Sequence, residues 1–309
     1  MGTQAPHSHA CLQAWIPGSG RRQYDPGMKL RAVLPADLDL RKVQHGIKWT
    51  VYTLLLINFG YYIVEDWNRA LHTLGPDAGW LDWAGAFATS IDEAGWFILL
   101  FMFELETYVL EDDAWTGWVA RVVHGARLLC YVMLAHTVYA YFFAATALYP
   151  AVPVDGATGP CSLSDSGVSW VYNLEYEDIT DRNCADLSAS EQIFSIEDGQ
   201  VVSDAAGLAL ERKLAWVDLA EAIIWLVIVL AIEIVVRLQN HDVTGGALMT
   251  VAKRSQVILY LVLIAIAIYW ATLSHWLYFW DELVWIGGFA AIDMNLSEWR
   301  EEILKEQAA

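Results

Sequence analysis

Residues 255–274 read SQVILYLVLIAIAIYWATLS, an unbroken run without a charged side chain. A helix of this length rises about 30 Å, at roughly 1.5 Å per residue, which matches the hydrocarbon core of a bilayer. Because a charged group is costly in lipid, such a run is typical of a membrane-spanning helix. The stretch therefore predicts that the chain is a membrane protein.

Further apolar blocks occur along the chain, and charged residues are concentrated between them. Hydrophobic residues make up 56% of the chain, and a soluble protein has no reason to sort them into blocks of this length. The blocks lie at about residues 47–64, 87–110, 119–149, 214–236, 255–274 and 276–292. We therefore expect an all-α polytopic membrane protein with about six transmembrane helices. The sixth block is short and carries two carboxylates, so crossing and re-entry both stay open for it.

Five regions follow from these blocks. They are a tail at 1–46, transmembrane helices 1–3 at 47–149, an acidic insert at 150–213, helices 4–6 at 214–293, and a C-terminal helix at 294–309. Within the second region, residues 65–83 are expected to form an acidic, Trp-bearing loop.

The insert differs from its neighbours, because Pro150 and Pro153 end the helical pattern and polar, turn-rich sequence follows. Residues 192–196 and 200–203 flank an Asp-Gly turn, which predicts a β-hairpin, and residues 168–174 could supply another strand. The insert is therefore expected to be a small, partly β domain.

Topology follows from the distribution of Lys and Arg, which favour the cytoplasmic side. With both termini in the cytoplasm, only four of the 18 basic residues lie outside: Arg69, Arg182, Arg212 and Lys213. The orientation predicts a multi-pass inner-membrane protein whose insert faces an oxidising space. Cys161 and Cys184 then form a natural disulfide, worth about 3 kcal/mol by loop entropy. Two free thiols are the alternative.

Carboxylates near the outer helix ends are the first candidates for function, because ionisable residues in apolar segments often mark an ion path. They are Asp92, Glu93, Asp218, Glu221, Asp281 and Glu282. If they converge, they would form a cation-attracting mouth. The alternative is structural: acidic residues at helix starts complement the helix dipole.

A second charged set lies near the inner ends and comprises Glu104, Glu106, Arg127, Glu233, Arg237 and Arg254. Glu106 and Arg127 are 21 residues apart, as are Glu233 and Arg254, so each pair can face across a helical hairpin. These pairs could form an inner gate or simply staple neighbouring helices. Glu233 can instead pair with Arg237 within its own helix.

His136 lies near the middle of the third block, where it could relay protons or be hydrogen-bonded in the core. The fourth and fifth blocks contain no His, so a bis-His haem core is disfavoured, and no cofactor is expected. No metal motif, nucleophile motif or phosphate-binding loop is present, so an enzyme is the least favoured class and no catalytic residue is assigned.

The net charge of −19 argues against nucleic acid as a partner. The fourth block lacks the repeated basic residues of a voltage sensor. The two charged sets described above instead favour a channel or transporter for a cation or protons. The alternative is a non-transporting membrane anchor, sensor or complex subunit, whose insert binds a protein partner or a second copy of the chain.

Overall fold

The computed structural model describes residues 40–108, 117–196, 200–240, 243 and 245–289. The described chain is mostly helical and contains one small sheet. It divides into two compact units. The sheet unit comprises Phe59–Val227 and Thr272–Ser274, and the helical unit comprises the described residues up to Asn58, Ile228–Ala271 and those from His275 onward.

The longer helices that contribute to the sheet unit are α2 (Leu40–Thr73), α3 (Trp80–Ala86), α4 (Ala88–Tyr108), α5 (Trp118–Ala147) and α7 (Ala205–Asn240). The expectation of a loop over residues 65–83 is wrong for most of its length, since α2 continues to Thr73 and α3 begins at Trp80. A helix can extend beyond its apolar block when polar residues at its end find partners in the fold.

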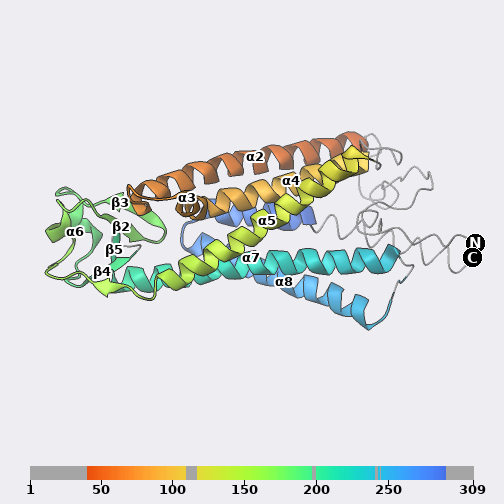
Figure 1. Cartoon of the computed structure of the whole chain (residues 1–309). Coiled ribbons are helices and arrows are strands. Elements are labelled where there is room, and N and C mark those ends of the chain that lie inside the picture. Colours follow the sequence, from red (N-terminus) through yellow and green to blue (C-terminus); the bar gives the residue numbers. More distant parts are fainter. Residues whose placement is uncertain (1–39, 109–116, 197–199, 241–242, 244, 290–309) are drawn as a thin grey trace, which may run out of the picture. The chain divides into compact units, whose positions relative to one another are not determined.

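The sheet consists of β1 (Val152–Pro153), β2 (Ser169–Tyr172), β3 (Glu175–Asp178), β4 (Ile193–Ile196) and β5 (Val201–Asp204). Its strand order is β1-β4-β5-β2-β3. The β4–β5 pair is antiparallel, which confirms the hairpin expected from the Asp-Gly turn, although the turn itself lies outside the described residues. Strand β2 pairs with β5 in parallel and with β3 in antiparallel fashion. The sheet lies at the end of α2 and α5, where α7 begins (Figure 1).

Strands β2, β4 and β5 contribute to a core on each face of the sheet, since successive residues of a strand point to opposite sides. Val171 and Val201 pack on one side with Leu148 and Leu208 from the helices. The residues of the other core are Trp170, Ile179, Cys184, Ile193 and Val202.

The second core is covered by two segments, one before β2 that carries η3 (Pro160–Leu163) and one after β3 that carries α6 (Cys184–Leu187). The predicted disulfide between Cys161 and Cys184 is present and joins these two short helices, with a Cα–Cα distance of 4.8 Å. It therefore holds the outer layer of the insert over the sheet. Cys130 on α5 is buried and has a free thiol.

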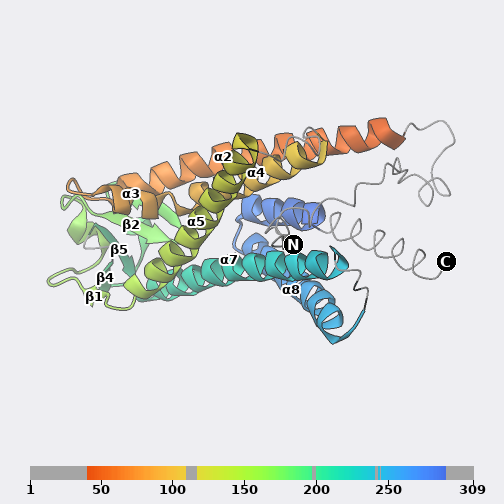
Figure 2. The same ribbon diagram turned by 45° about the vertical axis from the view of Figure 1, so that its right-hand side comes forward.

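Helices α4 and α5 pack along each other, as both views show (Figures 1 and 2). A Cβ atom at Gly95 would lie only 3.3 Å from the Leu134 side chain, so the absence of a side chain there permits the close approach. Thr137 on α5 is fully buried and donates to the backbone oxygens of Met133 and Ala88. The helical pair is thus fixed by both packing and hydrogen bonds.

The helical unit contains the later part of α7, α8 (Ala247–Thr272) and a helix over residues 276–289. Ala231 and Val235 pack against Met249 and Ala252. The sixth apolar block is thus helical as far as residue 289, where the described part ends.

In the part of the chain that the structure describes, two helices, over Arg121–Ala147 and Ala247–Thr272, are long and apolar enough to cross a membrane. A third crossing is added if α3 and the described part of α4, bent by 73° at their junction, count as one broken span. Large apolar side chains on these helices are exposed, as expected of lipid-facing surfaces. Examples are Leu128, Val132, Phe143, Ile258 and Leu261. Helix α7 is not in this set, and its apolar stretch carries Asp218, Glu221 and Glu233.

Candidate functional site

A small cavity with a mixed polar and apolar lining lies within the sheet unit, between the sheet and the adjoining helix ends. Its volume is about 40 Å³. One water molecule needs roughly 10–15 Å³ by the same measure, so the cavity has room for about three. Its polar lining residues are Arg69, Tyr141, Tyr176, Glu211 and Asp218. The apolar part of the wall consists of Ala144, Leu148, Val171, Leu174, Ile196 and Ala215.

The spacing of residues on α7 explains how this helix reaches the cavity. Glu211, Ala215 and Asp218 are separated by four and three residues, so they lie on one helix face. Glu221 follows Asp218 by one further turn, which makes their carboxylates neighbours on the surface of the helix. Helix α7 therefore brings three carboxylates to one end of the sheet unit.

Electrostatic interactions extend the site to other helices. Asp218 interacts with Glu221, Arg69, Glu211 and Glu65. Tyr141 interacts with Asp92, Asp218 and Asp66. We call these six carboxylates the acidic cluster: Glu65, Asp66, Asp92, Glu211, Asp218 and Glu221. Arg69 on α2 also lines the cavity, and its guanidinium is permanently charged.

Hydrogen bonds join the helices around the cluster. Asp66, which is 5% exposed, accepts from the backbone N of Ser90 at 2.8 Å and from its Oγ at 2.7 Å. One residue earlier on α4, Thr89 Oγ1 lies 3.1 Å from Tyr141 Oη on α5. Hydroxyl and carboxyl groups from three helices therefore meet beside the cavity.

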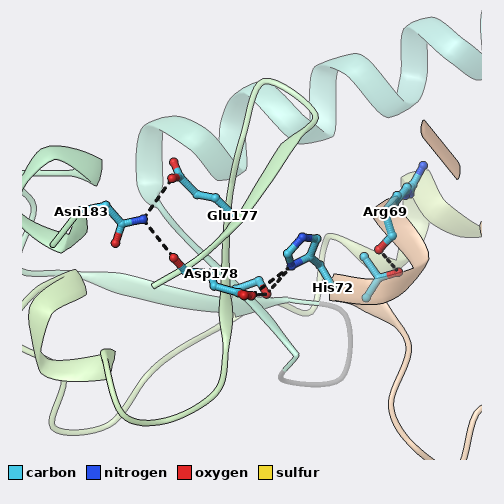
Figure 3. A network of polar contacts seen from close by, with 7 residues as sticks. Arg69, His72, Glu177, Asp178 and Asn183 are labelled. Atoms are coloured by element: carbon cyan, nitrogen blue, oxygen red, sulfur yellow. Dashed lines mark hydrogen bonds and ion pairs between the residues drawn. The ribbon is translucent and has the colours of Figure 1, made fainter. Parts of the chain in front are cut away.

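The C-terminal end of α2 is joined to the sheet through His72 (Figure 3). His72 Nδ1 lies 2.8 Å from Ser169 Oγ and 3.3 Å from Asp178 Oδ1, and its ring stacks on Tyr176. Beyond this contact, Asn183 Nδ2 donates to Glu177 Oε2 and to the Asp178 backbone oxygen. Because Tyr176 also lines the cavity, the His72 contact holds one cavity wall in place.

Another cavity wall is held by Arg212, the residue after Glu211. Its guanidinium donates to the backbone oxygens of Leu148 and Tyr149 and lies 5.1 Å from the Tyr149 ring centroid. Trp216 Nε1 donates to Tyr149 Oη. The beginning of α7 is therefore tied to the end of α5, which fixes the position of Glu211.

Of the predicted outer carboxylates, Asp92, Asp218 and Glu221 belong to the acidic cluster. Glu93 is buried on α4. Asp281 and Glu282 are buried in the helical unit, where Asp281 Oδ1 accepts a 2.7 Å hydrogen bond from Asn58 Nδ2. Whether all six form one mouth stays a prediction.

The predicted inner set is placed only in part. The side chains of Glu104 and Glu106 lie outside the described residues, so pairing of Glu106 with Arg127 stays a prediction. Glu233 accepts a 2.7 Å hydrogen bond from Arg237, which is the alternative foreseen within α7. Arg254 is exposed, and its pairing with Glu233 stays a prediction.

His136 lies in the middle of α5, as the apolar block implied. Its Nδ1 is buried, and among the described residues it has no hydrogen-bond partner. A relay role for His136 therefore stays a prediction.

Sequence reasoning missed Arg69, Glu211, Glu65 and Asp66. Two signals could have indicated them. Glu211 precedes Asp218 by seven residues, which is two helical turns, and Arg69 follows Glu65 by four, which is one. Both residues fell in segments that were assigned to a loop or to the insert, where helical spacing was not considered.

Comparisons with protein-family models, with curated proteins and with solved structures found no match to this chain.

Proposed function

We propose that this chain crosses the inner membrane six times, with both termini in the cytoplasm, and moves a proton or another small cation by way of the acidic cluster. The observation that carries the proposal is the water-sized cavity, which is lined by Glu211, Asp218 and Arg69.

Electrostatics support entry of a cation here. The acidic cluster contains six carboxylates, and Arg69 compensates one charge. Rings of acidic residues concentrate cations at the mouths of cation pores. Ionisable residues retained in an apolar helical protein are costly, and their retention favours a functional role over a purely structural one.

The chemistry of the site favours a proton over a metal cation. Thr89, Tyr141 and the cluster carboxylates carry groups that donate and accept hydrogen bonds, and these can pass a proton with the help of a few waters. Arg69 in the cavity wall repels any approaching cation, a metal ion and a hydronium ion alike, because its guanidinium is permanently charged. A proton that binds directly to a carboxylate needs no multidentate coordination.

The decisive experiment uses the full chain purified into liposomes that contain a pH-sensitive dye. We expect proton flux under an imposed membrane potential, and a decrease of about tenfold or more in Asp218→Asn, which cannot exchange a proton. Asp165→Asn removes an exposed carboxylate of the insert and is the matched control; its flux should equal that of the unchanged protein. Absence of flux, or equal flux in Asp218→Asn, would contradict the proposal. Dyes for Na⁺ and K⁺ in parallel samples identify the transported cation.

A second candidate function is docking of a protein partner on the insert. The observation that favours it is the edge strand β3, where Glu175, Glu177 and Asp178 are exposed. A charged edge discourages strand addition, so the partner would be a basic surface recognised by side chains. Glu175→Lys and Glu177→Lys should then abolish binding of this partner and leave flux unchanged.

A further inference from the structure

The turn between β2 and β3 has an unusual backbone. Asn173 and Leu174 have φ angles of 57° and 62°, so two consecutive residues with side chains occupy the left-handed region. A two-residue hairpin turn of this kind favours Asn followed by Gly, because a Cβ atom is costly at these angles. Asn173 fits this preference and Leu174 does not. Such a conformation persists only where the surroundings impose it.

The surroundings of the turn supply this constraint. The Leu174 backbone N donates a 3.1 Å hydrogen bond to Glu211 Oε1, and Glu211 is only 4% exposed. Asn173 Nδ2 donates a 3.0 Å hydrogen bond to the backbone oxygen of Leu273, which belongs to the same unit. The turn is therefore held from both sides by groups distant in sequence.

The position of Leu174 suggests what the turn achieves. Leu174 lines the cavity, together with Arg69, Glu211 and Asp218. Glycine would suit the backbone better but would leave that part of the wall open. An apolar group in the wall of a water-sized cavity hinders the entry of water and ions, as hydrophobic constrictions do in channels.

We propose that the β2–β3 turn closes the cavity through Leu174, and we call this turn the stopper. Glu211 holds the turn in place by accepting the hydrogen bond from the Leu174 backbone N–H, and we call this contact the latch. The inference rests on the proposed function, since it makes Leu174 the residue that controls access to the acidic cluster. Glu211 then has two roles, because the same carboxylate lines the cavity and holds the stopper. Breaking the latch should expose the cavity without removing Asp218.

The test measures access to position 174 in the full chain, purified in detergent, by the rate of reaction with a hydrophilic maleimide. Leu174→Cys is introduced together with Cys11→Ser and Cys130→Ser, and the disulfide is left intact. We expect slow labelling compared with Ser166→Cys, an exposed reference on the insert. Adding Glu211→Ala should raise the rate about tenfold or more, because the hydrogen bond from Leu174 to a charged acceptor is lost.

Two further variants separate the latch from a general effect of charge. Glu211→Gln keeps a side-chain oxygen that can accept from the Leu174 N–H, so its labelling rate should lie much closer to that of intact Glu211. Glu191→Ala removes an exposed carboxylate of the insert and should change nothing. If Leu174→Cys does not fold, hydrogen exchange of the Leu174 amide in Glu211→Ala and in the unchanged protein gives the same comparison.

The inference is overturned if Leu174→Cys reacts as fast as Ser166→Cys, or if Glu211→Ala leaves both labelling and amide exchange unchanged. Neither readout needs transport. Slow, latch-dependent labelling in a protein without flux would therefore refute the proposed function and support the stopper, whereas proton flux with rapid labelling would do the reverse.

Discussion

The contact between Asp66 and Ser90 gives a quantitative test of how the helices around the cavity are held. Ser90 is the third residue of α4, and the amides of the first turn have no partner within their own helix. Asp66 supplies the missing acceptor from α2, and it also accepts from the Ser90 hydroxyl. Replacement of Asp66 by Ala therefore removes two hydrogen bonds and leaves a buried amide without its acceptor.

The expected magnitude follows from these two bonds. A hydrogen bond to a charged group contributes about 1.5–3 kcal/mol, and loss of a helix cap costs about 1 kcal/mol. The desolvation of the Asp66 carboxylate, which also disappears, offsets part of this. We expect Asp66→Ala to lower the free energy of unfolding by about 2–3 kcal/mol. Ser90→Ala keeps the hydrogen bond from the backbone N–H and loses only that from the hydroxyl, so we expect the free energy of unfolding to fall by about 1 kcal/mol.

The assay is thermal unfolding of the detergent-solubilised protein, followed by tryptophan fluorescence. At about 2 °C per kcal/mol for a chain of this size, Asp66→Ala should lower Tm by about 4–6 °C and Ser90→Ala by about 2 °C. The double variant should lose less than the sum, since the two residues share one contact. Asp77→Ala, an exposed carboxylate after α2, should leave Tm unchanged. A decrease in Asp66→Ala no larger than that in Ser90→Ala would refute the reasoning.

The remaining predictions concern the insert and the helix backbone. Replacing Cys161 and Cys184 by Ser should destabilise the insert by about 3 kcal/mol, because it opens a loop that spans 23 residues, and faster hydrogen exchange in the sheet would reveal it; unchanged exchange would contradict it. Gly207→Ala should lower Tm, since its Cβ would clash with Ser203 Oγ at the start of α7, at a cost of about 1–3 kcal/mol. Gly60→Ala, where no atom lies within 4 Å of the added Cβ, should raise the free energy of unfolding by up to about 1 kcal/mol through helix propensity and so raise Tm. Equal shifts in the two glycine variants would exclude the packing explanation.

Sequence alone predicted features that depend on local physics. Long apolar runs indicated the helices, and two of them proved long and apolar enough to cross a membrane, with a third if the bent pair counts. The Asp-Gly turn between apolar runs predicted the β4–β5 hairpin, because turn chemistry acts over a few residues. The disulfide followed from two cysteines in a segment assigned to an oxidising space.

Tertiary structure decided the site. The wall of the cavity combines residues from α2, α5, the sheet and α7, which are far apart in the chain. Arg69 and Glu211 became candidates only when folding placed both in that wall. The hydrogen bonds that Ser90 donates to Asp66 and that Leu174 donates to Glu211 join residues 24 and 37 positions apart. Hydrophobic periodicity reports which side of a helix is apolar, but it carries no information about which helices become neighbours. The apolar runs of the sequence therefore determined where helices form and which of them suit a membrane. Packing determined which charged residues share a cavity.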